Sequence, residues 1–144
     1  GLSYSINSKS YRNFYDANEL KEFVRQSQKS DSTLSSGIIK KAVDYVSAFN
    51  NRDLSVIESM FARDCSLYDP NIGEISGRAS ILKFMSELFD NEHFSFVSSS
   101  IFSNENSASV EFVLTINNIS TRGVDIITWD AGKIVKIYAY LESK

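Results

Sequence analysis

The sequence of 144 residues has few of the residue types on which several kinds of protein depend. It contains one cysteine, Cys65, which excludes an intrachain disulfide, and one histidine, His93, so it cannot build a zinc site from several His and Cys ligands. No run of eighteen apolar residues is present, so nothing in the sequence spans a membrane. The net charge is −3, whereas nucleic-acid binding requires a basic face. We therefore predict no metal, no other cofactor, no nucleic-acid partner and no membrane partner.

Apolar residues are present in the amount that a globular core needs. Hydrophobic residues make up 42% of the chain, and its 10 phenylalanines suit the wall of an apolar cavity as well as a core. A chain of this length buries a core without metals or disulfides. We expect a cytoplasmic rather than a secreted protein, and because the chain begins with Gly1 rather than Met, we expect a trimmed or processed form.

The first 37 residues differ in composition from the rest of the chain. Residues 1–15 are polar and rich in Ser and Asn, which predicts an arm with little structure of its own. An apolar stripe then predicts a short amphipathic helix over residues 17–29. The Ser-rich stretch 29–37 is typical of a linker. The sequence therefore predicts an N-terminal arm with one helix over 1–37 and a main domain over 38–144.

The main domain shows a helical period first and a strand period later. Apolar spacing predicts helices over 38–50, 54–62 and 78–90, with a short strand over 65–69 that ends before the only proline, Pro70. Alternation then predicts four strands, over 93–102, 107–117, 122–130 and 133–142. This order indicates an α+β fold in which helices cover one face of an antiparallel sheet.

Three polar residues interrupt apolar surroundings. Tyr45 lies in the first helix of the main domain, Asp69 ends the first strand, and Asp125 shares a strand face with Ile127 and Trp129. A buried carboxylate is costly unless it stays protonated or finds a donor, which makes Asp125 a candidate functional group. Structural roles are the alternatives: Tyr45 as a core residue, Asp69 as a turn former before Pro70, and Asp125 as a water-bonded side chain.

Two stretches of sequence resemble a known family. Residues 44–70, DYVSAFNNRDLSVIESMFARDCSLYDP, are similar to the opening of ketosteroid isomerases and SnoaL-like polyketide cyclases, which belong to the nuclear transport factor two superfamily. Residues 123–142, GVDIITWDAGKIVKIYAYLE, resemble the last two strands of that family. The resemblance covers residues 38–142. It implies a cone-shaped fold, with three helices packed on a curved, mostly antiparallel sheet around one pocket.

The resemblance also implies chemistry. In steroid isomerases an Asp of the first strand moves the proton, while a Tyr of the first helix and a protonated Asp of the penultimate strand hydrogen-bond the enolate oxygen. These roles fall on Asp69, Tyr45 and Asp125. The family likeness thus implies a cofactor-independent isomerase, cyclase or dehydratase that acts on an apolar carbonyl compound. The alternative is a non-catalytic ligand-binding or oligomerisation module of the same fold.

The apolar residues predict a pocket and a second contact surface. We expect an apolar small-molecule ligand in a pocket lined by five large side chains, Phe49, Phe84, Phe112, Ile127 and Trp129. Residues 107–117 and 133–142 carry apolar side chains on both strand faces. A sheet that is apolar on both faces needs a second cover, which predicts a homodimer through the outer face of the meander.

Overall fold

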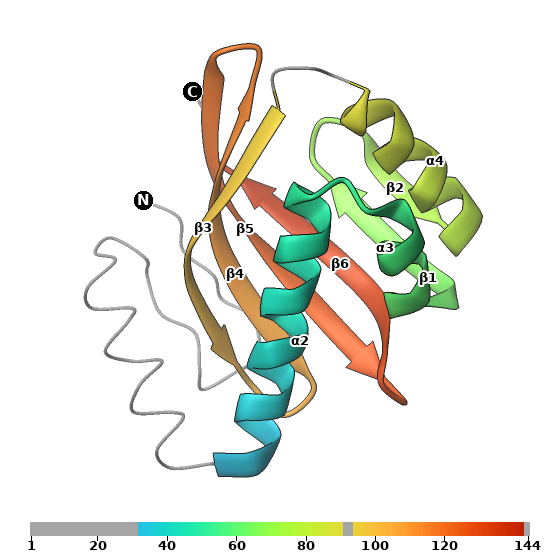
Figure 1. Cartoon of the computed structure of the whole chain (residues 1–144), viewed down its shortest axis with the longest axis vertical. Coiled ribbons are helices and arrows are strands. Elements are labelled where there is room, and N and C mark those ends of the chain that lie inside the picture. The colour runs from blue at the N-terminus through green and yellow to red at the C-terminus, as the bar shows by residue number, and fades with distance from the viewer. Residues whose placement is uncertain (1–31, 91–93, 143–144) are drawn as a thin grey trace.

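The computed structural model describes residues 32–90 and 94–142, and it has helices on one side of a curved sheet (Figure 1). The chain within these ranges follows the order α2 (Ser32–Asn50), α3 (Leu54–Met60), β1 (Phe61–Asp69), β2 (Gly73–Ser76), α4 (Arg78–Phe89), β3 (Phe94–Ser103), β4 (Ser107–Ile116), β5 (Ile119–Asp130) and β6 (Lys133–Leu141). This confirms the α+β class and the expected order of three helices and a closing meander.

All six strands form one sheet in the order β2-β1-β6-β5-β4-β3. Only the pairing of β1 with β6 is parallel, so the sheet is mostly antiparallel. This order places β1, β6 and β5 side by side. Tyr68 of β1 is level with Tyr138 of β6, and Ala139 of β6 is paired with Asp125 of β5. The end of β1, at Asp69, therefore lies in the same row of the sheet as Asp125.

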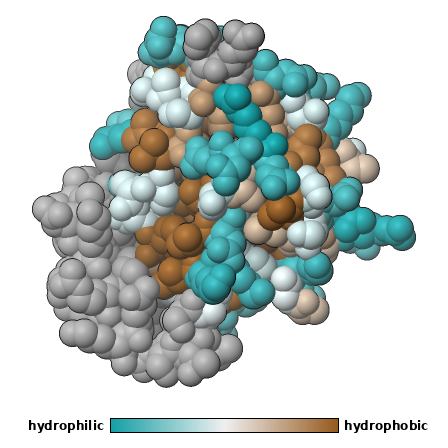
Figure 2. All heavy atoms as spheres, in the orientation of Figure 1, coloured by the Kyte–Doolittle hydropathy of each residue, from teal (hydrophilic) through white to brown (hydrophobic). Residues whose placement is uncertain are grey.

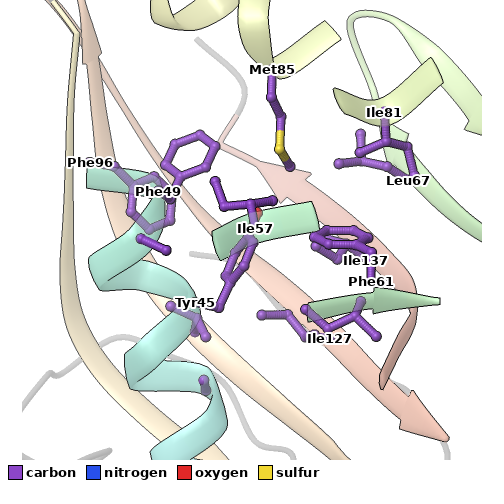
Figure 3. Packing of buried hydrophobic residues seen from close by; sticks show 14 of the residues in the cluster. Tyr45, Phe49, Ile57, Phe61, Leu67, Ile81, Met85, Phe96, Ile127 and Ile137 are labelled. Atoms are coloured by element: carbon purple, nitrogen blue, oxygen red, sulfur yellow. The ribbon is translucent and has the colours of Figure 1, made fainter. Parts of the chain in front are cut away.

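The helices cover the concave face of the sheet. Helix α2 packs against β3 and β4, and α4 packs against β1 and β2. Between them lies a core of large apolar side chains, including Ile57 of α3, Ile81 and Met85 of α4, and Ile137 of β6, each at most 2% exposed (Figure 3). The core therefore joins all three helices to the inner face of the sheet.

Two local signals in the sequence account for where elements begin. Asp53 precedes α3, and its Oδ1 accepts a hydrogen bond of 3.2 Å from the backbone N–H of Val56, as expected for an N-cap. Asn117 and Asn118 join β4 to β5 with φ of 52° and 68°. Two consecutive positive φ values are the mark of a tight two-residue hairpin turn. Strand β5 therefore starts at Ile119, earlier than the predicted residue 122.

Several predicted boundaries are wrong, and one short strand is missed. Helix α2 begins at Ser32 rather than at residue 38, so most of the predicted linker is helical; once a packed helix is nucleated, extension through Ser residues costs little. Strand β1 begins at Phe61, directly after α3. The sequence predicts no element over the short strand β2 (Gly73–Ser76), because Gly73 and Gly77 are typical of loops. The predicted helix over 17–29 lies outside the described residues.

The surface seen from the helix side combines apolar and polar areas. Apolar residues gather beside α2, towards β3, and hydrophilic residues cover much of the rest of the described surface in this view (Figure 2). Val43 of α2 is one of the exposed apolar residues of the protein, with 48% of its surface accessible. Among the helices of the described ranges, none is both long and apolar enough to cross a bilayer.

Candidate functional site

A cavity of about 270 Å³ lies between the helices and the inner face of the sheet. Helix α2 contributes Tyr45 and Phe49, and α4 contributes Phe84, Met85 and Leu88. The strands and the turn between β1 and β2 supply the remaining wall, mostly with aliphatic side chains. Figure 3 shows Tyr45 and Phe49 pointing from α2 into this interior, and Met85 entering it from α4. The cavity is therefore apolar, with a small number of polar groups that can orient a ligand.

Tyr45 occupies the inner face of α2 and is 3% exposed. Its ring lies 6.0 Å from the ring of Phe49 and 6.0 Å from that of Phe61, measured between centroids. Burial, and then the negative charge of Asp125, raise the pKa of the Tyr45 hydroxyl well above its usual value. No described residue forms a hydrogen bond with this hydroxyl. Tyr45 thus keeps its proton and can donate it in a hydrogen bond to a ligand.

Asp125 lies in the middle of β5, between Val110 of β4 and Ala139 of β6. It is 8% exposed, and two aliphatic neighbours offer its carboxyl no hydrogen bond. Burial, and then the charge of Asp69, raise the pKa of Asp125 to about 7. Near neutral pH a large fraction of Asp125 is therefore protonated, which gives the cavity a second hydrogen-bond donor.

Asp69 is the last residue of β1 and is only partly buried. Its Oδ1 accepts a hydrogen bond of 2.8 Å from the backbone N–H of Asn71, across Pro70. Such a turn holds the carboxylate in one orientation. Asp69 also lines the cavity. The three predicted polar residues therefore open onto one cavity.

Three of the five predicted wall residues border this cavity: Phe49, Phe84 and Phe112. Phe112 is stacked on Phe96 with 4.6 Å between ring centroids, and Phe96 in turn lies 5.2 Å from Phe49. Aromatic packing of this kind gives the wall a defined shape.

Ile127 and Trp129 do not line the cavity, which corrects the prediction for these two residues. Ile127 is fully buried, and its strand neighbours are Ala108 and Ile137. Trp129 borders a separate hollow of about 230 Å³ at the far end of the sheet. Alternation correctly places both side chains on the face of Asp125, but the cavity covers only one end of β5.

Two polar residues of the cavity wall were not predicted from the sequence: Asn71, which follows Pro70, and Thr121, which lies just before the predicted strand over 122–130. The extension of β5 to Ile119 places Thr121 on the inner face, four residues before Asp125. Alternation within a longer strand would have found it. His93 lies outside the described residues. Within 32–90 and 94–142, no group of three or more His, Cys, Asp or Glu side chains is arranged to hold a metal ion.

Comparison with known families agrees with this architecture. The family model named SnoaL-like domain matches residues 42–137, which is more than half of the chain. The chain belongs to the SnoaL-like family. No curated protein matches it at a significant level.

Several solved structures have a fold similar to that of this SnoaL-like domain. A proposed ketosteroid isomerase from Kribbella flavida has a TM-score of 0.70 and 20% identity, covering 78% of this chain and 82% of the other. A steroid delta-isomerase from Pseudomonas aeruginosa has a TM-score of 0.64 and 17% identity, covering 76% and 82%. An NTF2-like protein of unknown function from Mesorhizobium loti has a TM-score of 0.70 and 17% identity, covering 78% and 96%. At these identities the likeness establishes the fold and leaves the chemistry to the site itself.

Proposed function

We propose that the SnoaL-like domain binds an apolar carbonyl compound and moves a proton on it without a cofactor. The observation that carries the proposal is the meeting of Tyr45, Asp69 and Asp125 in one apolar cavity, with the pKa of Asp125 raised to about 7. A base and two neutral donors in a water-poor site are what enolisation requires.

The proposed reaction begins with a carbonyl oxygen between Tyr45 and Asp125. The Asp69 carboxylate removes a proton from the carbon next to the carbonyl, and the C–H electron pair moves into the new carbon–carbon double bond of the enolate. The Tyr45 hydroxyl and the protonated Asp125 carboxyl donate hydrogen bonds to the developing negative oxygen. Return of the proton from Asp69 to another carbon of the conjugated enolate completes an isomerisation. In a cyclisation the enolate carbon would instead attack a second carbonyl carbon, whose oxygen takes up the proton held by Asp69. In a dehydration the hydroxyl on the next carbon would leave as water, with its second hydrogen supplied by Asp69.

A second function, ligand binding without chemistry, is supported by the turn at Asp69. The hydrogen bond from the Asn71 N–H to Asp69 Oδ1 would also form if this carboxylate only ended the strand. A binding module would still use the apolar cavity and its two buried hydrogen-bond donors, Tyr45 and protonated Asp125. Proton transfer separates the two functions, because only the enzyme needs Asp69 as a base.

The proposal is tested with phenols, because a phenolate oxygen resembles an enolate oxygen. Fluorescence titration at pH 6 should show saturable binding of beta-naphthol to the wild type, and at least tenfold weaker binding to a Tyr45→Phe/Asp125→Leu double variant. The control is Tyr138→Phe on the outer face of the sheet, which should bind as the wild type does. Asp69→Asn should keep phenol binding while it abolishes exchange of the α-hydrogen of a bound bicyclic ketone with deuterated water.

Absence of saturable binding to the wild type, or equal binding to the double variant, would contradict the oxyanion site. Phenol binding with no exchange in any variant would instead favour the non-catalytic module.

We also propose a homodimer through the outer face of the sheet. Tyr68 and Tyr138 are stacked there with 4.4 Å between centroids, and Tyr140 lies 5.0 Å from Tyr138. These rings stand on the face opposite to the described helices, and an aromatic surface of this kind suits a second copy. Light scattering should report a dimer at micromolar concentration, converted to monomer by Tyr138→Glu. A wild-type monomer across that range would contradict the proposal.

A further inference from the structure

The inner face of β5 carries polar groups at two separate places, Asp125 and Thr121. Tyr45 and Asp125 are nearly buried, whereas Thr121 and Asn71 border the same cavity and are more exposed. No described residue forms a hydrogen bond with the Thr121 hydroxyl. A polar group that faces an apolar cavity without a protein partner is available to a ligand.

Strand geometry sets the distance between the two places. Thr121, Gly123 and Asp125 follow one another on the inner face of β5. At about 3.3 Å per residue, the Cα atoms of Thr121 and Asp125 are about 13 Å apart. A ligand oxygen bound at Asp125 is therefore too far from Thr121 to reach it directly, and only a second oxygen at the opposite end of the ligand can do so.

The wall between Asp125 and Thr121 is apolar. Gly123 is paired with Phe112 on β4 and with Leu141 on β6, and both of these side chains line the cavity. A Cβ atom at Gly123 would lie 2.8 Å from Cζ of Phe112 and 2.9 Å from Cδ2 of Leu141. The side chains of Phe112 and Leu141 thus pack closely against the backbone of Gly123. Together they form an apolar wall against which a ring system can pack.

The volume limits the size of that ring system. The cavity of about 270 Å³ lies just below the range of roughly 300–1,000 Å³ that is usual for drug-sized ligands. A molecule that reaches from Asp125 to Thr121 within this volume must be long and narrow. This favours two or three fused rings.

We propose that Thr121 is a second anchor of the cavity, which holds an oxygen at the far end of a flat, two- or three-ring ligand. The inference rests on the proposed function for the other end of the ligand, where Tyr45 and Asp125 hold the carbonyl oxygen. The Thr121 hydroxyl both donates and accepts hydrogen bonds, so it accepts either a carbonyl or a hydroxyl as its partner. The substrate class is therefore a small fused-ring carbonyl compound with an oxygen function at each end.

The test compares two phenols that differ at one end. Beta-naphthol carries one hydroxyl, and its diol counterpart carries a second hydroxyl at the opposite end of the same ring system. Fluorescence titration at pH 6 should show that the wild type binds the diol roughly fivefold more tightly, after correction for its two equivalent ends. Thr121→Val should remove this preference and leave the affinity for beta-naphthol within about twofold. Thr121→Ser, which keeps the hydroxyl, should restore the preference.

The matched control is Thr128→Val, which makes the same change on the outer face of the same strand and should keep the wild-type preference. If the wild type binds both phenols equally, or if Thr121→Val keeps the preference, Thr121 is not an anchor and the proposed function still stands. If neither phenol binds the wild type saturably, the proposed function is overturned, and the second anchor with it.

Discussion

The two faces of β5 place charged residues in opposite environments. Asp125 faces the cavity, where burial and Asp69 raise its pKa to about 7. Arg122 faces outward, and its Nε and one terminal guanidinium nitrogen donate to the Glu142 carboxylate at 3.0 and 3.2 Å. This pairing lowers the pKa of Glu142. Three residues along β5 therefore separate a carboxyl group whose pKa is raised from an arginine whose partner carboxylate has a lowered pKa.

The difference shows that surroundings, rather than residue type, decide what a carboxyl group does. Asp125 has aliphatic neighbours on both adjacent strands, whereas Glu142 has a guanidinium and bulk water. Only the inward carboxyl can serve as a hydrogen-bond donor near neutral pH. The outward pair is exposed, and exposed ion pairs contribute little to stability.

The largest expected effect is on the pH dependence of the free energy of unfolding, which tests the contrast between Asp125 and Glu142. The folded protein binds the Asp125 proton up to about pH 7, whereas an unfolded chain releases it near pH 4. The wild type should therefore lose unfolding free energy as the pH rises from about 4 to 7, by at most about 4 kcal/mol from this group. Urea unfolding at several pH values should show this loss in the wild type and not in Asp125→Asn. The same slope in both proteins would argue against a neutral Asp125.

A smaller effect on the free energy of unfolding is expected from a substitution at Gly123, which lies between Asp125 and Thr121 on β5. An added Cβ would meet the carbonyl oxygen of Tyr140 as well as Phe112 and Leu141. Gly123→Ala should therefore lower the unfolding free energy by roughly 1–3 kcal/mol. Gly37→Ala in α2 is the matched control, because a Cβ there meets nothing within 4 Å, and it should be neutral or stabilising. Equal stability of the two variants in urea unfolding would show that Phe112 and Leu141 do not close over Gly123.

The smallest effect is expected for the outer pair. Glu142→Gln removes a carboxylate whose pKa is lowered in the folded protein. In the wild type this carboxylate adds to the free energy of unfolding above its unfolded pKa, and that contribution is lost on acidification. This pH dependence has the opposite sign to that of Asp125. The melting temperature of Glu142→Gln should fall slightly at pH 7 in low salt and match the wild type in high salt, because salt screens exposed charges. A large, salt-independent loss would contradict an exposed pair.

The sequence predicted the fold class and much of the site because both depend on regular spacing. Helical period and alternation located the elements, and Pro70 marked the end of the first strand. Alternation also placed Asp125, Ile127 and Trp129 on one face, as the structure has them. It could not show that the cavity ends before Ile127, because the depth of a cavity depends on how far α2 and α4 lie from the sheet.

Thr121 was missed for a related reason. Its place in the cavity depends on a two-residue turn at Asn117 and Asn118, which extends β5 beyond its predicted start. A boundary error of a few residues hardly affects the assignment of fold class. It decides, however, whether a side chain at the end of a strand belongs to the site.

The donor role of Asp125 depends on its protonation, which can be measured by NMR titration of its carboxyl carbon. Protein labelled at the aspartate carboxyl carbons would be titrated from acid to mildly alkaline pH, and the Asp125 signal assigned by its absence from Asp125→Asn. We predict a midpoint of about 7. A midpoint near 4, as in an unperturbed aspartate, would show that Asp125 is ionised at neutral pH and would contradict its role as a donor in the cavity.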